Sequence, residues 1–539
     1  MDGVARNGLG KMNQFTSGAT AVISTLGLMI GAANIWRFPR VVAKNSDSQG
    51  SLVFLIVWLL FTFLWSVPMV TFELAVGRFT KKSVILSFQQ LLGNRSIWAA
   101  AIIQLILFAH TCFYTVITGW CLYYMCYIIT YGLPGNLTES ELIFNDFTAS
   151  RWPILFQGLC CVMSGLLLVK GAVSIERANI FLLPILLAII VFNLFWSISR
   201  PHAINGLKYM FNPNWGSLGK ASVWVDACSH NAFDTSAGAG SLLTYATMMS
   251  RDQPIVKYGI LLPITNNIVS LSSGITIFSL VFSTLTPLNY SQTEIVEILK
   301  TSGPGGTGIT FIWTPVLYSS IGVTGRVIAA LFFLCLFCAG FSSLIAMMET
   351  VAKTIIQFGI KSRLVAVMVV VIFHFLCGLP SSISLFLLSN QDYVWNVSLL
   401  LSGLCFQGLL ISYGSNRFRT DAVNNFTTGS DCYLPVIWEY ICKYICPLEA
   451  VGLLIWWFVN AVTKDIARHR PWYRMANRGI FITVIEWFLL FMLAVLFNLL
   501  SAVFKPEWYI DSSNHQLSKE ETTIKPDDPE IGGNDDVEP

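Results

Sequence analysis

Two short stretches of the chain place polar and charged residues inside runs that are otherwise apolar. The first runs from Gly27 to Pro39 and contains Asn34 and Arg37 among glycine and alanine residues. A membrane-spanning helix must satisfy its backbone hydrogen bonds internally, so this mixture predicts a helix that breaks inside protein or beside water. Carbonyl groups freed by such a break are oxygen ligands of the kind that hold a hard cation.

The second stretch, from His230 to Ser241, also interrupts an apolar run, and it contains Asp234. Interrupted helices at corresponding positions in two halves of a chain are typical of transporters built from inverted repeats, whose binding site lies between the breaks at the bilayer midplane. Close packing of helices through glycine and serine is the alternative. Because Asn34, Arg37 and Asp234 lie inside the breaks, the sequence favours a binding site.

The rest of the chain supplies the helices that must position these stretches. Its 539 residues are 54% hydrophobic and 12% charged, which indicates a polytopic membrane protein and argues against a soluble enzyme. A formal net charge of +3 gives no indication of nucleic-acid binding. Apolar runs of about 20 residues, each long enough to cross a bilayer, predict twelve membrane helices at roughly 16–42, 51–78, 97–131, 152–170, 177–199, 221–249, 255–286, 322–358, 364–388, 391–415, 433–461 and 479–504.

Basic residues between the predicted helices indicate the orientation. Most of them fall on one side, which the positive-inside rule identifies as the cytoplasm: Arg6, Lys11, Arg78, Lys81, Lys82, Lys170, Arg177, Arg251, Lys257, Lys361 and Arg363. The basic outer loop at 464–478 is an exception. We therefore expect a multi-pass protein of the plasma membrane, or of the inner membrane in a bacterium. Residues 1–14 and an acidic, disordered tail at 505–539 would both be cytoplasmic.

Several motifs resemble the neurotransmitter:sodium symporter family, whose members include leucine-transporter-like proteins. They occur in order, from about residue 15 to the last predicted helix: Gly31 to Pro39, Glu73 to Arg78, Tyr114 with Trp120, Ile175 to Arg177, Thr244 to Ala246 and Ala339 to Ser343. The resemblance implies an all-α transporter domain over 15–504. It comprises inverted repeats of five helices at about 15–199 and 221–415, with helices 1 and 6 broken, and extra helices 11 and 12 within 433–504.

The same resemblance implies two sodium sites made of oxygen ligands, which suit this cation. The first would consist of the Met29 carbonyl with the side chains of Asn34, Asp234 and Asn266. The second would consist of the carbonyls of Gly27, Ile30 and Ala339 with the hydroxyls of Ser342 and Ser343. For the two serines, a hydrogen bond to their own helix backbone is the alternative role.

Asp234 departs from the family, which usually has a hydroxyl residue at this position. A carboxylate at the centre of a membrane helix costs about 2.5 to 3.5 kcal/mol. A sodium ion about 4 Å away would return roughly 4 kcal/mol at an effective dielectric constant near 20. The chloride site of related transporters corresponds here to Trp58, His230, Asp234, Asn266 and Ser270, of which only the last two fit.

These substitutions suggest the hypothesis that Asp234 is a built-in anion that replaces chloride. A protonated Asp234, or one paired with His230 one helical turn away, is the alternative. Dependence on chloride therefore stays open at this point.

The substrate pocket implied by the resemblance is lined by residues of helices 1, 3, 6 and 8: Leu28, Met29, Gly31, Ala32, Ala33, His110, Tyr114, Phe233, Asp234, Ser236, Ala239 and Met347. The N–H groups of Ala32 and Ala33 suit a carboxylate, because they begin a half-helix. Monoamine transporters of the family carry aspartate where this chain has Gly31. The sequence thus favours import of an amino acid or amino-acid-like solute, first of all a large neutral amino acid. A cationic amine or an osmolyte is the alternative, because Asp234 adds a carboxylate.

The expected outer gate is an ion pair above aromatic residues: Arg37 with Asp392, over Tyr114 and Phe233, with Phe311 from the outer segment 289–320. The usual residues of the inner gate are replaced, since Met12, Phe15 and Gln357 occupy their positions. An intramembrane enzyme and a channel are the other classes considered. The sequence contains no His-Glu-x-x-His, Gly-x-Ser-x-Gly or Walker lysine motif. The sequence leaves the sodium stoichiometry and the oligomeric state open.

Overall fold

The computed structural model describes residues 14–300, 308–426 and 431–509, and every regular element in these ranges is helical. Nine of the described helices are long and apolar enough to cross a membrane, or up to eleven if each of two bent pairs forms one span. The expectation of an all-α polytopic membrane protein is confirmed. The N-terminal segment and most of the acidic tail lie outside the described residues.

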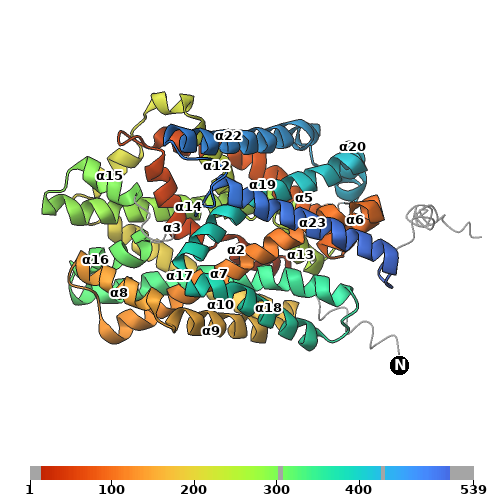
Figure 1. The fold of residues 1–539 in the computed structure, drawn as a ribbon, viewed down its shortest axis with the longest axis horizontal. Coiled ribbons are helices and arrows are strands. Elements are labelled where there is room, and N and C mark those ends of the chain that lie inside the picture. The colour runs from red at the N-terminus through yellow and green to blue at the C-terminus, as the bar shows by residue number, and fades with distance from the viewer. Residues whose placement is uncertain (1–13, 301–307, 427–430, 510–539) are drawn as a thin grey trace, which may run out of the picture.

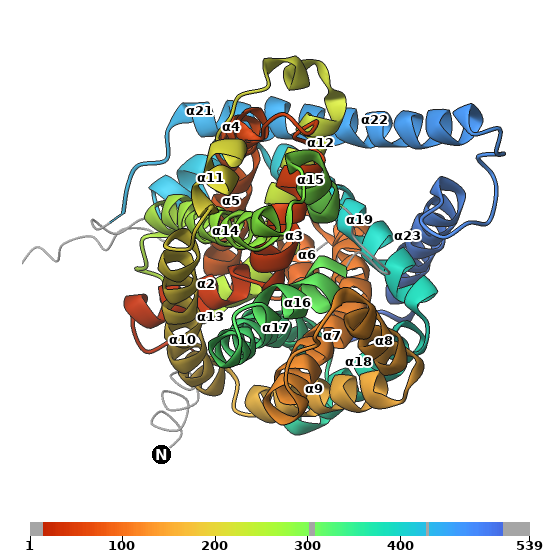
Figure 2. The same ribbon diagram turned by 90° about the vertical axis from the view of Figure 1, so that its left-hand side faces the viewer.

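The long helices and the halves of broken ones are α2 (Gly18–Met29), α3 (Ala32–Lys44), α4 (Leu52–Phe61), α5 (Val67–Thr80), α7 (Ile97–Tyr131), α9 (Trp152–Leu168), α10 (Ala172–Ile198), α12 (Ala221–Asp234), α13 (Ser241–Met248), α14 (Ile255–Leu285), α17 (Val323–Gln357), α18 (Arg363–Ile383), α19 (Leu385–Tyr413), α22 (Cys446–Ala467) and α23 (Ile480–Phe504). They form a bundle with α3 near its centre and with α22 and α23 at its periphery (Figure 1, Figure 2).

Shorter elements connect or extend these helices: η1 (Thr62–Ser66), α6 (Val84–Leu92), η2 (Asn94–Ser96), α8 (Leu137–Ala149), α11 (Ala203–Met210), η3 (Trp215–Gly219), η4 (Thr286–Leu288), α15 (Gln292–Lys300), η6 (Ile309–Trp313), α16 (Thr314–Ser319), α20 (Ser415–Arg417), η7 (Phe418–Asn424), α21 (Val436–Tyr440) and η8 (Ile441–Ile445). The boundaries of the two inverted repeats stay a prediction.

The first predicted break separates α2 from α3, which meet at an angle of 48°. The helix stops at Ile30, whose backbone leaves the helical region, and resumes after the extended Gly31. The Gly31 N–H donates to Asn34 Oδ1 at 2.8 Å, so the side chain of Asn34 caps the start of α3. The polar residue that made this stretch unusual in the sequence is therefore the one that stabilises the break.

The second predicted break, between α12 and α13, spans residues 235–240. Gly238 and Gly240 have φ angles of +95° and +83°, a conformation that glycine adopts without steric cost. Their N–H groups donate to the two carboxylate oxygens of Glu73 on α5, at 2.5 and 2.8 Å. This buried carboxylate supplies the acceptors that the unwound backbone lacks, so helix 6 is interrupted as expected.

Two boundaries differ from the sequence-based expectation. The segment between the predicted helices 97–131 and 152–170 contains a helix, α8, because the side chain of Asn136 accepts the N–H of Glu139 at 2.9 Å and so caps its first turn. The predicted helices 364–388 and 391–415 are divided earlier, at Ser384. Its extended backbone ends α18, and its hydroxyl caps α19 by accepting the N–H of Leu387 at 3.4 Å.

Candidate functional site

Four buried polar side chains from three helices meet beside the two breaks. Asn34 on α3 donates through Nδ2 to Asn266 Oδ1 at 2.9 Å and to Ser270 Oγ at 2.8 Å, both on α14. Asn266 Nδ2 and Ser270 Oγ donate in turn to Asp234 Oδ2, at 3.1 and 2.6 Å. Three of the residues predicted for the first sodium site are thus joined to each other through hydrogen bonds.

One oxygen of this cluster has no partner among the described residues. Asp234 Oδ1 is buried and accepts no hydrogen bond, whereas Oδ2 accepts two. A buried carboxylate oxygen without a donor is costly, and a cation is the ligand that its charge suits. The residues therefore fit a sodium ion, which would be held by this carboxylate with the side chains of Asn34 and Asn266. Met29, whose carbonyl completes the predicted set, lines the adjacent cavity.

The residues predicted for the second sodium site lie where α2 packs against α17. Ser343 Oγ donates to the carbonyl of Leu28 at 2.8 Å, and so connects the two helices. Ser342 Oγ donates to the Ala339 carbonyl of its own helix at 3.1 Å. Both hydroxyls use their proton on a backbone carbonyl, which leaves oxygen lone pairs that a cation can share. The remaining predicted members, Gly27 and Ile30, are buried at the end of α2.

A small cavity lies between the breaks. Its volume is about 20 Å³, enough for a water molecule but not for an amino acid. The walls include eleven of the twelve predicted substrate residues: Leu28, Met29, Gly31, Ala33, His110, Tyr114, Phe233, Asp234, Ser236, Ala239 and Met347. The twelfth, Ala32, donates its N–H to the Tyr114 hydroxyl at 3.3 Å. Although Ala239 has a short side chain, the cavity that it lines is small in this structure.

Aromatic rings line the cavity together with Ala239. The His110 ring packs against Phe233 and Tyr114, with centroids 5.2 and 5.9 Å away, and its Nδ1 has no hydrogen-bond partner among the described residues. Movement of the His110 or Phe233 ring would therefore change the size of the cavity. Leu107 and Leu399 also line this cavity and were not among the predicted residues. Both are ordinary apolar residues of long helices, so nothing in the sequence indicates that they line a cavity.

Gly31 lies where a side chain has little room. A Cβ atom at this position would be 3.0 Å from the Tyr114 hydroxyl and 3.2 Å from Ser343 Oγ. These distances are tighter than ordinary van der Waals contact, so an aspartate there would require its neighbours to move. Glycine at this position leaves the Tyr114 hydroxyl in the cavity wall, where it accepts the N–H of Ala32.

The residues aligned with a chloride site are only partly joined to Asp234. His230 Nε2 lies 3.8 Å from Asp234 Oδ2, too far for a hydrogen bond, and neither ring nitrogen of His230 has a partner in the described chain. The His230 ring instead stacks on Phe38 at 5.3 Å, and Trp58 lies on the same phenylalanine at 4.7 Å. Among the described residues, Asn266 and Ser270 donate hydrogen bonds to the carboxylate, and His230 lies within ion-pair distance of it, so a pairing of Asp234 with His230 stays an alternative.

The predicted outer gate joins α3 to α19 above the cavity. Arg37 Nη1 lies 3.5 Å from Asp392 Oδ1, with side-chain exposures of 17% and 14%. The Arg37 guanidinium also lies over the Phe233 ring, 4.5 Å from its centroid. Phe311 packs in an aromatic cluster with Trp120, Tyr124 and Phe333, and its part in the gate stays a prediction.

Comparison with known proteins agrees with this arrangement of broken helices and polar residues. Residues 12–148 and 139–503 match the sequence model of the sodium:neurotransmitter symporter family. The chain belongs to this family. It is therefore a sodium-dependent transporter of a small solute and not an enzyme. Its resemblance to the family, first seen in short motifs, extends over nearly the whole chain.

Similar members of the family come from archaea, bacteria and animals. An uncharacterized sodium-dependent transporter of Methanocaldococcus jannaschii is 25% identical, covering 84% of this chain and 92% of the relative. One from Bacillus subtilis is 24% identical, with 81% and 96% covered. A sodium- and chloride-dependent GABA transporter of Drosophila melanogaster is 25% identical over 80% of this chain and 50% of the relative. The crystal structure of MhsT in complex with L-phenylalanine shares the fold, with a TM-score of 0.70, 24% identity and coverage of 82% and 99%.

Two buried polar residues support the site without lining the cavity. Glu73, part of a family motif in the sequence, holds the unwound segment of helix 6 in this symporter. Asn179 on α10 lies against the other break, with its amide oxygen 2.5 Å from the place of a Cβ on Gly27. A larger residue at Gly27 would therefore displace Asn179. The sequence signal for Asn179 is an asparagine within the apolar run of α10, which by itself is equally typical of helix packing.

Glu73→Gln should weaken the break in helix 6. Glutamine has one acceptor oxygen, so its amide group would face the second glycine N–H instead of accepting from it. Each hydrogen bond to a charged group is worth about 1.5 to 3 kcal/mol, and we expect the melting temperature to fall by several degrees with a matching loss of uptake. Thermal unfolding of the purified protein measures this. Glu141→Gln, at an exposed glutamate of α8, is the control; equal melting of the two variants would contradict the proposed clamp.

Proposed function

We propose that the chain couples two sodium ions to the import of an amino acid or amino-acid-like solute, with large neutral amino acids as the first candidates. The observation that carries this choice is the crowded position of Gly31, where a Cβ atom would lie 3.0 Å from the Tyr114 hydroxyl. At this position the chain has no carboxylate, and the start of α3 would present N–H groups beside the Tyr114 hydroxyl, with Asp234 elsewhere in the cavity wall. Such donors suit the carboxylate of a substrate.

Two structural features support alternating access for this proposal. The cavity is too small for an amino acid, so binding requires the walls to move, and the two broken helices provide backbone that is not locked in one helix. The outer ion pair of Arg37 and Asp392 connects α3 to α19 and must separate when the site opens outward. In the proposed orientation both chain ends are cytoplasmic, and the transporter lies in the plasma membrane or a bacterial inner membrane.

Coupling to two ions supplies enough energy for accumulation. One sodium ion that moves down a tenfold gradient and 100 mV releases roughly 1.4 plus 2.3 kcal/mol. Two ions therefore provide about 7 kcal/mol, which can concentrate a neutral solute by about five orders of magnitude. One sodium ion would be held at Asp234 with Asn34 and Asn266, and the other between α2 and α17.

Uptake into proteoliposomes tests the proposal directly. Purified protein is supplied with each of the twenty amino acids, several amines and several osmolytes, with and without an inward sodium gradient. Accumulation of at least one amino acid against its gradient, abolished when potassium replaces sodium, is the expected result. The second candidate is a cationic amine, favoured by the unpartnered Asp234 Oδ1, and accumulation of amines alone would replace the first proposal by this one.

Tyr114→Phe should raise the KM of the amino acid about tenfold with a smaller change in the maximal rate. The substitution removes one hydroxyl that would donate to a carboxylate, a loss worth about 1.5 kcal/mol or more, and it leaves the ring packing intact. Concentration-dependent uptake measures the effect. Tyr127→Phe, on the same helix but outside the cavity, is the matched control. An unchanged KM in Tyr114→Phe would exclude the hydroxyl from substrate binding.

A further inference from the structure

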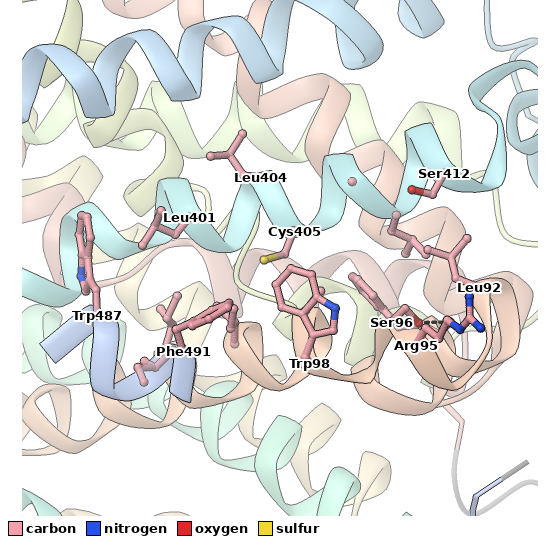
Figure 3. A pocket seen from close by; sticks show the side chains of 17 residues that line it. Leu92, Arg95, Ser96, Trp98, Leu401, Leu404, Cys405, Ser412, Trp487 and Phe491 are labelled. Atoms are coloured by element: carbon pink, nitrogen blue, oxygen red, sulfur yellow. Dashed lines mark hydrogen bonds between the residues drawn. The ribbon is translucent and has the colours of Figure 1, made fainter. Parts of the chain in front are cut away.

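A groove of about 610 Å³ opens on the side of the bundle, away from the candidate transport site. It is lined by residues of α6, η2, α7, α19 and α23 (Figure 3). This volume is within the range of cavities that bind small organic molecules. None of the residues proposed for sodium, substrate or gate lines the groove, so the transport mechanism leaves its role unexplained.

The walls of the groove are apolar and reach the outer surface of the bundle. Trp98 on α7 is 38% exposed and Phe491 on α23 is 42% exposed, and Leu401 and Leu404 of α19 line the space between them. In a membrane protein this surface faces hydrocarbon, where exposed aromatic and aliphatic side chains carry no cost. An occupant of the groove would therefore be in contact with lipid chains along its length.

Polar groups occur at one end only. Arg95, Ser96 and Ser412 lie together at that end, whereas Trp487 and Phe491 lie at the other (Figure 3). Ser96 Oγ already donates to backbone carbonyls, but Arg95 is exposed and forms no hydrogen bond or ion pair with another described residue. The arrangement matches an amphiphilic molecule with an anionic head beside Arg95 and an apolar tail beside the tryptophans.

The length of the groove matches one leaflet of a bilayer. Leu401 and Ser412 are eleven residues apart on α19, which corresponds to about 16 Å along a helix. Half of the hydrocarbon core of a bilayer is about 15 Å thick. Arg95 lies in the connection between α5 and α7, on the same side as Lys81 and Lys82, so the polar end faces the cytoplasmic leaflet in the proposed orientation.

We propose that the groove binds a phospholipid with an anionic headgroup from this leaflet. The phosphate lies at the Arg95 guanidinium, and one acyl chain lies along α19 toward Trp487. Clusters of basic residues at the cytoplasmic ends of membrane helices attract anionic lipids, and here one arginine is combined with a preformed apolar channel. Because α23 forms part of the wall and already packs on α7, bound lipid would connect the peripheral helix α23 to α19. The proposal is independent of which solute is transported.

Gly408 provides a test that leaves the packing intact. It lines the groove on α19, and a Cβ atom there would meet no other atom within 4 Å. In Gly408→Leu the new side chain would therefore occupy the groove instead of displacing a neighbour. Gly452 on α22 also has open space around its Cβ position and is outside the groove, so Gly452→Leu is the matched control.

The full-length protein is reconstituted in phosphatidylcholine vesicles with a trace of phosphatidylglycerol that carries a photoreactive diazirine on its acyl chain. After illumination, mass spectrometry identifies the labelled peptides. We expect labelling of peptides from α19 and α23, at least fivefold reduced in Gly408→Leu and unchanged in Gly452→Leu. Equal labelling of both variants would overturn the proposal. So would a change of oligomeric state in Gly408→Leu by light scattering, because the groove would then be an interface between copies of the chain.

The headgroup is tested by a second pair of variants. Arg95→Gln should reduce labelling by phosphatidylglycerol about fivefold, the effect of one arginine near an anionic surface. Arg151→Gln, at an exposed arginine on the other side of the membrane, should leave it unchanged. The same experiment with diazirine-labelled phosphatidylcholine should give weak labelling that does not depend on Arg95. Equal capture of the two lipids by the natural protein, or capture independent of Arg95, would contradict an anionic headgroup.

Discussion

Asp234→Asn should convert uptake that is indifferent to chloride into uptake that requires it. The hypothesis is that the carboxylate is the fixed negative charge beside the first sodium ion. Asparagine has nearly the same shape but no charge, and Asn266 and Ser270 would still be in place to bond it. A sodium ion about 4 Å from a carboxylate gains roughly 4 kcal/mol at an effective dielectric constant near 20. Without chloride, the sodium concentration for half-maximal uptake is therefore expected to rise about 100-fold or more.

The measurement compares uptake in chloride and in gluconate at a series of sodium concentrations. The natural protein should transport equally in both anions, and Asp234→Asn should recover part of its activity only in chloride. Asp226→Asn is the control on the same helix. Asp226 forms a partly exposed ion pair with Lys44 at 2.8 Å, and such a pair contributes at most about 1 kcal/mol.

Two outcomes would contradict this role. If the natural protein stops transporting when gluconate replaces chloride, Asp234 does not replace the anion. If Asp234→Asn keeps the same sodium dependence in both anions, the natural residue is protonated and acts only through its hydrogen bonds.

The breaks could be predicted because their causes are local. Gly31 and Asn34 are three residues apart, so the Asn34 side chain can accept the N–H of Gly31, the residue just before α3. Both residues can be read directly from the sequence. Asp234 was conspicuous for the same reason, since a charge inside an apolar run requires an explanation. The helix α8 lies between the predicted spans 97–131 and 152–170 and was not among the predicted helices, although Asn136 and Glu139 have the spacing of a helix cap.

Other features depend on contacts between helices that are distant in the sequence. The cavity of about 20 Å³ results from the His110 and Phe233 rings, which come from α7 and α12, and no local pattern gives its size. Asn179 could not be assigned without knowing that α10 packs on α2 at Gly27. The groove at Arg95 combines residues of η2, α7, α19 and α23, each of which by itself is an ordinary surface residue of a membrane helix.

Replacing both Ser342 and Ser343 by alanine should weaken sodium binding about 100-fold at the second predicted site. Each hydroxyl would supply one oxygen ligand, and contacts of this kind to a charged partner are worth about 1.5 to 3 kcal/mol. The Ser343 hydroxyl also joins α17 to the Leu28 carbonyl of α2 at 2.8 Å, next to Gly27 and Ile30. Loss of the hydroxyls therefore removes both the ligands and the direct connection between the helices that sodium would hold together.

Sodium-dependent thermal stabilisation measures this effect without transport. An ion that binds only the folded protein stabilises it by RT ln(1 + [Na⁺]/Kd), so weaker binding moves the titration to higher sodium. Thr350→Val is the matched control, because its hydroxyl donates to the Ala346 carbonyl at 2.9 Å on the same helix but belongs to neither site.

If Ser342 and Ser343 contribute only to helix packing, the sodium titration of thermal stability should give a different result. The double variant would then melt at a lower temperature at every sodium concentration, with an unchanged midpoint of the titration. Single variants separate the two functions further. Ser342→Ala removes a ligand without touching α2, whereas Ser343→Ala removes a ligand and also the hydrogen bond to Leu28. A larger shift of the sodium midpoint in Ser343→Ala than in Ser342→Ala would indicate that the connection between α2 and α17 contributes to ion binding.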